Sequence, residues 1–246
     1  MKLKFNPEQR NLTNTFKLLN SFRNEQTDPD SFYGFLALDG IRLLRRYTVI
    51  EDMTVLDIGG GAGYFSAAFK ANGAKCFVLE PFVEELYWRG TPPNNSMVAD
   101  GYNIPFRDRT VDISFSSNVL EHVADPKKFI DEMIRITKQD GIIFFCFTGW
   151  YSPWGGHETS PWHYLGGEYA KKLYEKKYQK KVKNAFGESL FKIKIKDVMT
   201  MVKDMDQVEI LDLRPRYYPS WTKPILKVPL LNEVITWNLA VIMRRK

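Results

Sequence analysis

Short apolar runs alternate with segments of helical character between residues 54 and 148, and this alternation constrains the fold more than any other feature. The pattern predicts strands at 54–58, 74–80, 96–99, 111–116 and 141–148, and helices at 64–71 and 125–137. The last of these strands, GIIFFCFT, is apolar throughout, as expected of a central strand that is covered on both faces. Strands that alternate with helices in this way indicate an α/β fold with a doubly wound parallel sheet.

Further helices and strands are predicted on either side of this region. Helices are expected at 8–22 and 30–47, then a lysine-rich helix to about residue 183 and a helix near 194–204, with closing strands at 208–213 and 236–244. We therefore expect one domain over residues 1–246, with a helical cap at 1–49 and an insertion at 149–190.

The chain has a formal net charge of +6 at pH 7, and the positive charge is concentrated in one segment. Residues 171–183 contain seven lysines and one glutamate, which predicts either a solvated helix face or a surface that meets an anionic partner such as a membrane. The sequence has no zinc-finger spacing and no RNA-binding aromatic signature, so nucleic acid is disfavoured as a partner.

The sequence also bears on the compartment. It has no run of about 18 apolar residues that would predict a transmembrane helix, and its N-terminal residues are too polar for a signal-peptide core. Cys76 and Cys146 lie in apolar, strand-like runs and belong to no metal or redox motif, so we expect two buried thiols. These features predict a cytoplasmic protein.

A glycine cluster follows the first predicted strand, in the stretch VLDIGGGAGYF at residues 55–65. Glycines allow a tight turn and a close approach of the backbone to a ligand, and the start of the following helix presents free N–H groups. The spacing is D-x-G-x-G-x-G, formed by Asp57, Gly59, Gly61 and Gly63. A dinucleotide loop would instead need glycine where Tyr64 stands. A carboxylate beside glycine amides suits a ligand that carries both an ammonium and a carboxylate group.

At these residues the sequence resembles the class I S-adenosylmethionine (SAM)-dependent methyltransferases of the type 11, UbiE-like branch. The resemblance implies a Rossmann-like, doubly wound sheet of seven strands, mostly parallel with an antiparallel C-terminal strand. It also implies SAM as cofactor and S-adenosylhomocysteine as product. Asp57 would then bind the cationic end of the methionine moiety, directly or through water. The N–H groups of the loop would bind the carboxylate and backbone of the same moiety.

Three further motifs carry the resemblance in chain order: VLEP at 78–81, VADGYNIPF at 98–106 and SFSSNVLEHVADP at 114–126. By resemblance, Glu80, followed by Pro81, would bind the ribose hydroxyls, because a carboxylate about 20 residues after the glycine loop can do so. The remaining expected cofactor residues are Asp100 and Gly101 near the adenine amino group, and Asn118 and Val119 beside the sulfur.

The stretch WYSPWGGHETSPWHYLGG, residues 150–167, follows the central strand and should lie at the sheet edge where ligands bind. Tryptophans form walls for apolar rings, sugars and cations, and a histidine can accept the proton of an acceptor hydroxyl. The expected acceptor residues are Trp150, Trp154, Glu158 and Trp162, with His157, His163 and His122 as candidate bases. The pattern H-E-x-x-x-x-H at residues 157–163 does not place its two histidines on one face of a helix, as the H-E-x-x-H motif of zinc enzymes does. We therefore expect no metal. A glycine-rich loop beside a site also suits a lid.

Residues 152–163, SPWGGHETSPWH, resemble a narrower, actinobacterial group of methyltransferases, for which the resemblance implies cell-envelope or glycolipid precursors as acceptors. The lysine-rich composition departs from the arginine-rich character of that group, which leaves other acceptors open. Together with the basic helix and the apolar, basic linker at 217–234, these features predict O-methylation of a small-molecule, glycan or lipid-linked acceptor. They also predict contact with the inner membrane surface.

Three alternatives remain open from the sequence. A C-methyltransferase on a quinone-like ring would use the same VLEHVADP motif, a SAM-binding regulator would bind the cofactor without turnover, and a nucleic-acid methyltransferase would be recruited by the lysine-rich helix. A nicotinamide oxidoreductase is disfavoured by Tyr64 at the third glycine position.

Overall fold

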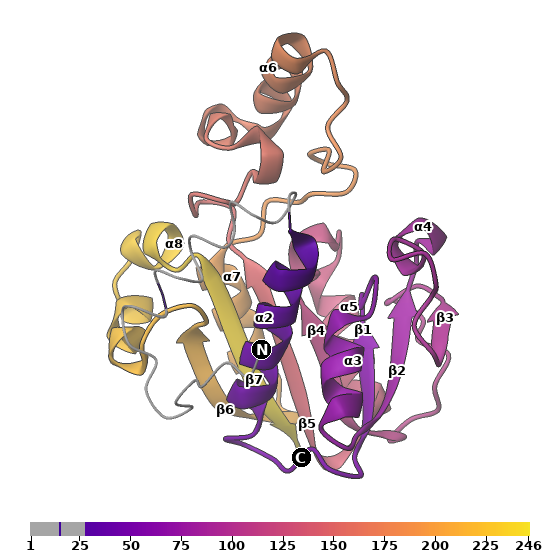
Figure 1. Ribbon diagram of the computed structural model, residues 1–246. Coiled ribbons are helices and arrows are strands. Elements are labelled where there is room, and N and C mark those ends of the chain that lie inside the picture. Colours follow the sequence, from indigo (N-terminus) through magenta and orange to yellow (C-terminus); the bar gives the residue numbers. More distant parts are fainter. Residues whose placement is uncertain (1–14, 16–27) are drawn as a thin grey trace.

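A computed structural model describes residues 15 and 28–246 of the chain, and the predicted helix at 8–22 lies almost wholly outside these residues. Its centre is a seven-stranded sheet with the order β3-β2-β1-β4-β5-β7-β6 (Figure 1). The strands are β1 (Thr54–Ile58), β2 (Lys75–Glu80), β3 (Ser96–Val98), β4 (Val111–Ser117), β5 (Thr137–Thr148), β6 (Val208–Pro215) and β7 (Asn238–Arg245). Strands β1 to β5 are parallel, and β7 runs antiparallel to both of its neighbours. The predicted fold class is confirmed.

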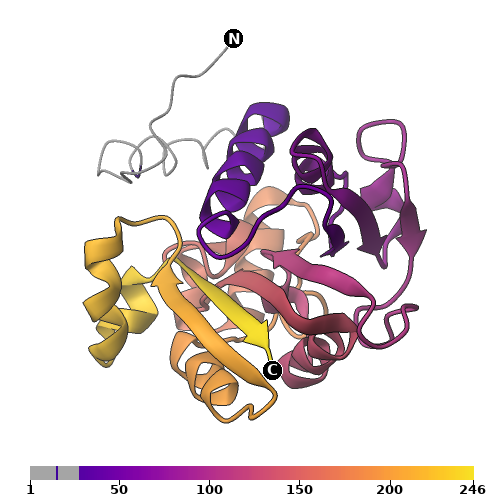
Figure 2. The same ribbon diagram turned by 90° about the horizontal axis from the view of Figure 1, so that it is seen from below.

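Helices cover both faces of the sheet (Figures 1 and 2). The helices of the described residues are α2 (Pro29–Leu44), α3 (Tyr64–Ala71), α4 (Val83–Leu86), α5 (Pro126–Ile136), α6 (Gly167–Tyr178), α7 (Ile195–Lys203) and α8 (Leu231–Ile235), with short 3₁₀ turns η2 (Leu120–His122), η3 (His157–Thr159), η4 (Trp162–Leu165) and η5 (Ser220–Lys227). Asp28 and Asp125 cap α2 and α5, each accepting a hydrogen bond from the backbone three residues on, and a proline follows each cap. Among the described residues, no helix is both long and apolar enough to cross a bilayer.

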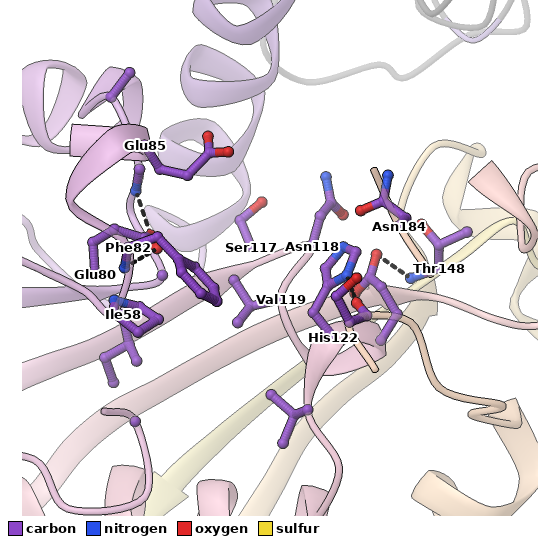
Figure 3. A pocket seen from close by; sticks show the side chains of 18 of the residues that line it. Ile58, Glu80, Phe82, Glu85, Ser117, Asn118, Val119, His122, Thr148 and Asn184 are labelled. Carbon is purple, nitrogen blue, oxygen red and sulfur yellow. Dashed lines mark hydrogen bonds between the residues drawn. The ribbon is translucent and has the colours of Figure 1, made fainter. Parts of the chain in front are cut away.

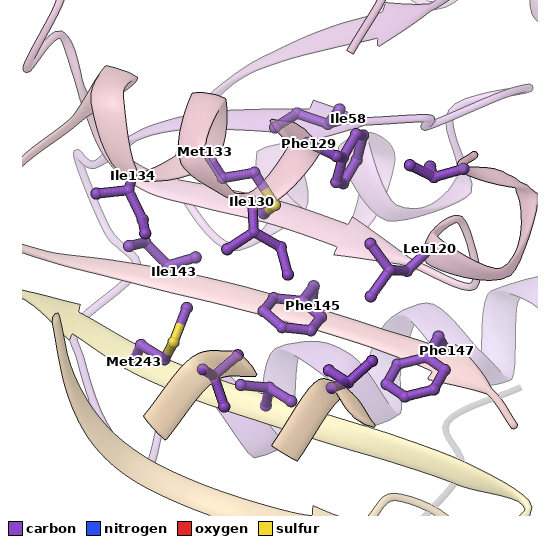
Figure 4. Close-up of a cluster of buried hydrophobic side chains, with 14 of the residues drawn as sticks. Ile58, Leu120, Phe129, Ile130, Met133, Ile134, Ile143, Phe145, Phe147 and Met243 are labelled. Atoms are coloured by element: carbon purple, nitrogen blue, oxygen red, sulfur yellow. The ribbon is translucent and has the colours of Figure 1, made fainter. Parts of the chain in front are cut away.

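The alternation of side chains along β5 builds a core on each face of the sheet. Phe144 faces α2 and α3 and stacks on Phe115 with ring centroids 4.7 Å apart. Phe145 and Phe147 belong to the opposite core, which contains Met133 of α5 and side chains of α7 (Figure 4). Because both faces are buried, β5 reads as a continuous apolar run.

Strand β5 begins at Thr137, earlier than the predicted start at residue 141. The register with β4 shifts, so that Val111 pairs with Thr137 and Ile113 with Ile142. Asp140 lies in this irregular stretch with φ of 61°. Residues 138–141, which precede the predicted strand, therefore form a bulge within β5.

Helix α6 ends at Tyr178, not near residue 183 as predicted, because Gln179 takes a left-handed conformation with φ of 51° and ends the helix. The backbone N–H groups of Lys183 and Asn184 then donate to Glu158 instead of to helix carbonyls. The insertion lies above the carboxyl ends of the parallel strands (Figure 1).

Candidate active site

A cavity of about 800 Å³ opens at the carboxyl edge of the sheet, where ligands of doubly wound folds bind. Its volume falls within the range of about 300–1,000 Å³ that is usual for ligand pockets. The ends of β1, β2 and β4 form one side, and the insertion after β5 forms the other (Figure 3). Phe32 and Tyr33 of α2 complete the wall.

The glycine loop packs directly against the segment that follows β4. Gly59 has φ of +72°, and a Cβ atom added there would lie 2.5 Å from Cγ2 of Val119. The Gly59 N–H donates to the Leu79 carbonyl at 2.7 Å. Gly59 and Val119 both line the cavity, so only a residue without a side chain allows this approach.

Glu80 ends β2 and braces the glycine loop from the side. Its Oε2 accepts a hydrogen bond from the Gly61 N–H at 3.1 Å, and its Oε1 accepts one from the Phe82 N–H at 3.2 Å (Figure 3). Burial raises the pKa of this carboxyl above its ordinary value. Glu80 therefore fixes the loop and also presents its carboxyl group to the cavity.

Asp57 lies beneath the loop and is only 1% exposed. Its Oδ2 has no hydrogen-bond partner among the described residues. Burial, and next the negative charge of Glu80, raise the pKa of Asp57 to about 8. A cation bound in the cavity would favour the ionised form of this carboxyl group.

Most of the predicted cofactor residues come together on this side of the cavity. Asp100 accepts the Tyr102 N–H at 2.9 Å, and the Asn118 side-chain oxygen accepts from Nδ2 of Asn238 at 2.8 Å. The structure places Asp57 and Gly63 behind the lining. The predicted residues that line the cavity are Gly59, Gly61, Glu80, Pro81, Asp100, Gly101, Asn118 and Val119.

On the opposite side, Glu121, His122 and His157 form a compact cluster that lines the cavity. The two imidazole rings meet edge to face with centroids 5.0 Å apart. Nδ1 of His122 donates to the Ser189 carbonyl at 2.5 Å, and Oε1 of Glu121 accepts the Thr148 N–H at 3.2 Å. Burial, with a smaller contribution from the neighbouring His122, lowers the pKa of His157 to about 3. His157 is therefore a neutral imidazole at neutral pH.

Two tryptophans from distant parts of the chain form an aromatic wall next to this cluster. Trp154 of the insertion stacks on Trp237 with ring centroids 5.2 Å apart and an interplanar angle of 23°. Both rings line the cavity. Such a wall suits the face of a ring or a sugar.

Comparisons with known proteins agree with this geometry. A family model described as a methyltransferase domain matches residues 56–145. An uncharacterized methyltransferase from Mycobacteroides abscessus is 36% identical over 250 residues, covering 96% of each chain. Another from Mycolicibacterium gilvum is 37% identical over 244 residues, covering 95% of this chain and 94% of its own. The chain belongs to this methyltransferase family.

Solved structures show the same fold for the methyltransferase. A SAM-dependent methyltransferase from Mesorhizobium loti superposes with a TM-score of 0.55 at 16% identity, covering 82% of this chain and 96% of its own. Another SAM-dependent methyltransferase, from Aquifex aeolicus, superposes with a TM-score of 0.52 at 17% identity, covering 99% of this chain and 100% of its own. The family and these neighbours identify the protein as a SAM-dependent methyltransferase.

The residues of the cavity fit this cofactor. The unpartnered carboxylate oxygen of Asp57 lies behind the loop, where it can stabilise the positive charge that SAM carries. Close packing of Gly59 against Val119 leaves backbone rather than side chain at the ligand's surface. Glu80 keeps its carboxyl group at the cavity, which suits a ligand with neighbouring hydroxyls.

Four residues of the methyltransferase that were predicted at the acceptor or as its base lie away from the cavity. Trp150 is buried against His163 and Phe186, with ring centroids 5.4 and 5.0 Å away. Trp162 packs on Tyr178. His163 is buried, with Nε2 3.2 Å from the Ser152 carbonyl. Their contacts hold the insertion together.

Glu158 likewise acts within the loop. Its carboxylate accepts hydrogen bonds from the Lys183 N–H at 2.6 Å, the Asn184 N–H at 2.8 Å and Nδ2 of Asn184 at 2.8 Å. These contacts bring Lys183 and Asn184 to the cavity. The ammonium of Lys183 crosses to Glu85 at 2.8 Å and lies 5.3 Å from the ring centre of Trp88, so it joins the insertion to the opposite wall.

Trp237, Lys183 and Asn184 also line the cavity, although the sequence did not predict them there. Because β7 is antiparallel to β5, its first residue Asn238 pairs with Thr148, the last residue of β5. The start of β7 therefore reaches the carboxyl edge, and the expected antiparallel strand was the signal for Trp237. No comparable signal precedes Lys183 and Asn184, which depend on the path of the insertion.

Proposed function

We propose that this SAM-dependent methyltransferase transfers the methyl group to a hydroxyl oxygen of a small-molecule, glycan or lipid-linked acceptor. The observation that carries the proposal is the division of one cavity into two halves. Glycine-loop and carboxylate residues line one half, and Glu121, His122, His157 and Trp154 line the other. Asn118 and Val119 lie between them in the chain and also line the cavity.

When bound, SAM supplies an activated methyl group, and transfer to an acceptor oxygen leaves S-adenosylhomocysteine. The task of the protein is to align the acceptor oxygen with the methyl carbon and the sulfur, and positioning can contribute about 7–11 kcal/mol to lowering such a barrier. The stacked pair Trp154 and Trp237 would orient the acceptor. The hydroxyl would be held and would lose its proton at the cluster of Glu121, His122 and His157. His163, buried within the insertion, takes no part.

The experiment is methyl transfer from radiolabelled SAM into fractionated extract of the source organism, with wild type and the His157→Ala variant. We expect label in a lipid, glycan or small-molecule fraction, as an O-methyl group by NMR, and its loss in the variant. Label in RNA or protein, a C-methyl product, or wild-type labelling by the variant would contradict the proposal.

We also propose that the protein binds to an anionic membrane surface and takes up its acceptor there. Trp221 and Leu230 of the η5–α8 segment are 70% and 81% exposed, and Lys227 lies between them in the chain. Exposed apolar side chains beside lysines suit binding at a lipid interface. The segment leads directly into Trp237, which lines the cavity.

Flotation with phosphatidylcholine vesicles, with and without phosphatidylglycerol, tests this second proposal. The wild-type protein should float only with the anionic vesicles, and the double variant Trp221→Gln, Leu230→Gln should float much less. The Val49→Gln variant changes an exposed apolar residue outside the segment and serves as the control. Equal flotation of all three proteins, or no flotation of the wild type, would contradict it.

A further inference from the structure

We propose that Glu121, His122 and His157 form a binding site for one divalent metal ion of the Zn²⁺ type at the acceptor side of the cavity. The role of the ion, which is to hold the acceptor oxygen, rests on the proposed function. Its binding does not, because neither SAM nor an acceptor supplies a ligand in the site as described.

The three side chains converge on one point from two separate segments. Glu121 and His122 come from the η2 turn after β4, and His157 begins the η3 turn of the insertion. Each residue contributes one donor atom, and the three donor atoms all lie within 4.8 Å of one another. An ion placed between them would thus need only small side-chain movements to reach bonds of about 2.0–2.2 Å.

Two buried polar atoms of these side chains have no hydrogen-bond partner among the residues that the structure describes. They are Oε2 of Glu121 and Nε2 of His157, and Glu121 is only 1% exposed. Leaving such groups unsatisfied is unfavourable, and a bound ion would satisfy both at once. One ion would thus satisfy an unpaired carboxylate oxygen and an unpaired imidazole nitrogen in this partly buried cluster.

In His122 and Glu121, the polar atom that would not bind the ion is hydrogen-bonded to the backbone, as is usual in metal sites. Nδ1 of His122 donates to the Ser189 carbonyl at 2.5 Å, which leaves Nε2 with its lone pair as the free donor. Oε1 of Glu121 accepts the Thr148 N–H at 3.2 Å and leaves Oε2 free (Figure 3). Backbone partners of this kind orient metal ligands and fix the histidine tautomer.

The donor set also indicates the class of metal. Two histidines and one carboxylate are the ligands of catalytic zinc sites that keep a fourth position open, and the same set binds other divalent transition metals. All three residues line the cavity, so the open position would face the acceptor. An ion there would bind the acceptor hydroxyl and, as a Lewis acid, lower its pKa, so that its proton would pass to solvent in the cavity and not to a ligand side chain.

The test is metal binding by the full-length, untagged protein, without SAM or acceptor. After treatment with a chelator, the protein is titrated with Co²⁺ by visible absorption and with Zn²⁺ by calorimetry. We expect one equivalent to bind, and Glu121→Gln, His122→Ala and His157→Ala each to weaken binding at least tenfold. Glu84→Gln changes another cavity-lining carboxylate, outside the cluster, and should bind as the wild type does.

A measurement on the wild type alone guards against variants that fold poorly. Electron paramagnetic resonance of the Cu²⁺-loaded protein should show coupling to the nitrogens of two imidazoles. No saturable binding of Co²⁺ or Zn²⁺, no imidazole coupling, or equal binding by folded variants would overturn the site. A protein that binds the ion but methylates no hydroxyl would keep the site and refute the proposed function instead.

Discussion

At the scale of single residues, Gly59 sets the distance between the glycine loop and Val119. Gly59→Ala would place a Cβ atom 2.5 Å from Val119 at a φ of +72°, a conformation that costs a residue other than glycine about 1–2 kcal/mol. We expect SAM affinity to fall at least tenfold and the melting temperature to fall by several degrees. Calorimetry with SAM and thermal unfolding measure both.

Gly34→Ala provides the matched control for this glycine variant. Gly34 lies within α2, and a Cβ atom there would meet nothing within 4 Å. Since alanine favours a helix more than glycine does, stability should hold or rise and SAM affinity should not change. Normal SAM binding by Gly59→Ala would show that the close approach is not required.

Asp57 should couple SAM binding to pH. Its pKa of about 8 in the free protein lies far above the ordinary value of 3.8, so it is mostly protonated at pH 7. The positive charge of SAM favours the carboxylate, so binding should release protons, and affinity should rise with pH up to about 8 and then level off. Calorimetry at pH 7 in buffers of different ionisation enthalpy counts the released protons.

The same pKa shift has a consequence for the stability of the protein without ligand. A raised carboxyl pKa contributes stability that is complete below the ordinary value and is lost as the pH rises through about 8. Asp57→Asn should therefore weaken both the proton release and the loss of stability between pH 6 and about 8. Unchanged proton release in the variant would assign the coupling to another group.

At the scale of elements, the insertion between β5 and α7 contains two tryptophans with different roles. Trp154 stacks on Trp237 at the cavity, whereas Trp162 packs on Tyr178 away from it. Trp154→Ala should lower methyl transfer into the acceptor fraction at least tenfold without changing SAM affinity. Trp162→Ala should stay within about twofold of wild type. Equal losses in both variants would mean that Trp154 only supports the loop.

The two halves of the cavity differ in how far the sequence predicts them. Each cofactor motif directly follows a strand, so the parallel sheet brings Gly59, Glu80, Asp100 and Asn118 to one edge once the strands are assigned. The acceptor side depends instead on the path of a long insertion. Trp150 is buried within the insertion and Trp154 lines the cavity, although neither local composition nor spacing distinguishes them.

At the scale of the whole molecule, residues distant in sequence complete the cavity. The antiparallel return of β7 brings Trp237 beside Trp154, and Lys183 links the insertion to Glu85 across the cavity. Pairwise contacts of this kind leave no local pattern, which is why the fold class, Trp154 and His157 could be predicted from the sequence but the pairing of Trp154 with Trp237 could not. We propose from this arrangement that one cavity binds SAM and the acceptor in separate halves.

The most direct test of this claim measures SAM affinity and methyl transfer in parallel for Glu80→Ala and His157→Ala. Glu80→Ala should lose at least tenfold in SAM affinity, because it removes both the cavity carboxylate and the hydrogen bond that holds Gly61. His157→Ala should keep SAM affinity within about twofold and lose transfer. A His157→Ala protein that fails to bind SAM, or one that transfers methyl groups at the wild-type rate, would show that the cavity is not divided in this way.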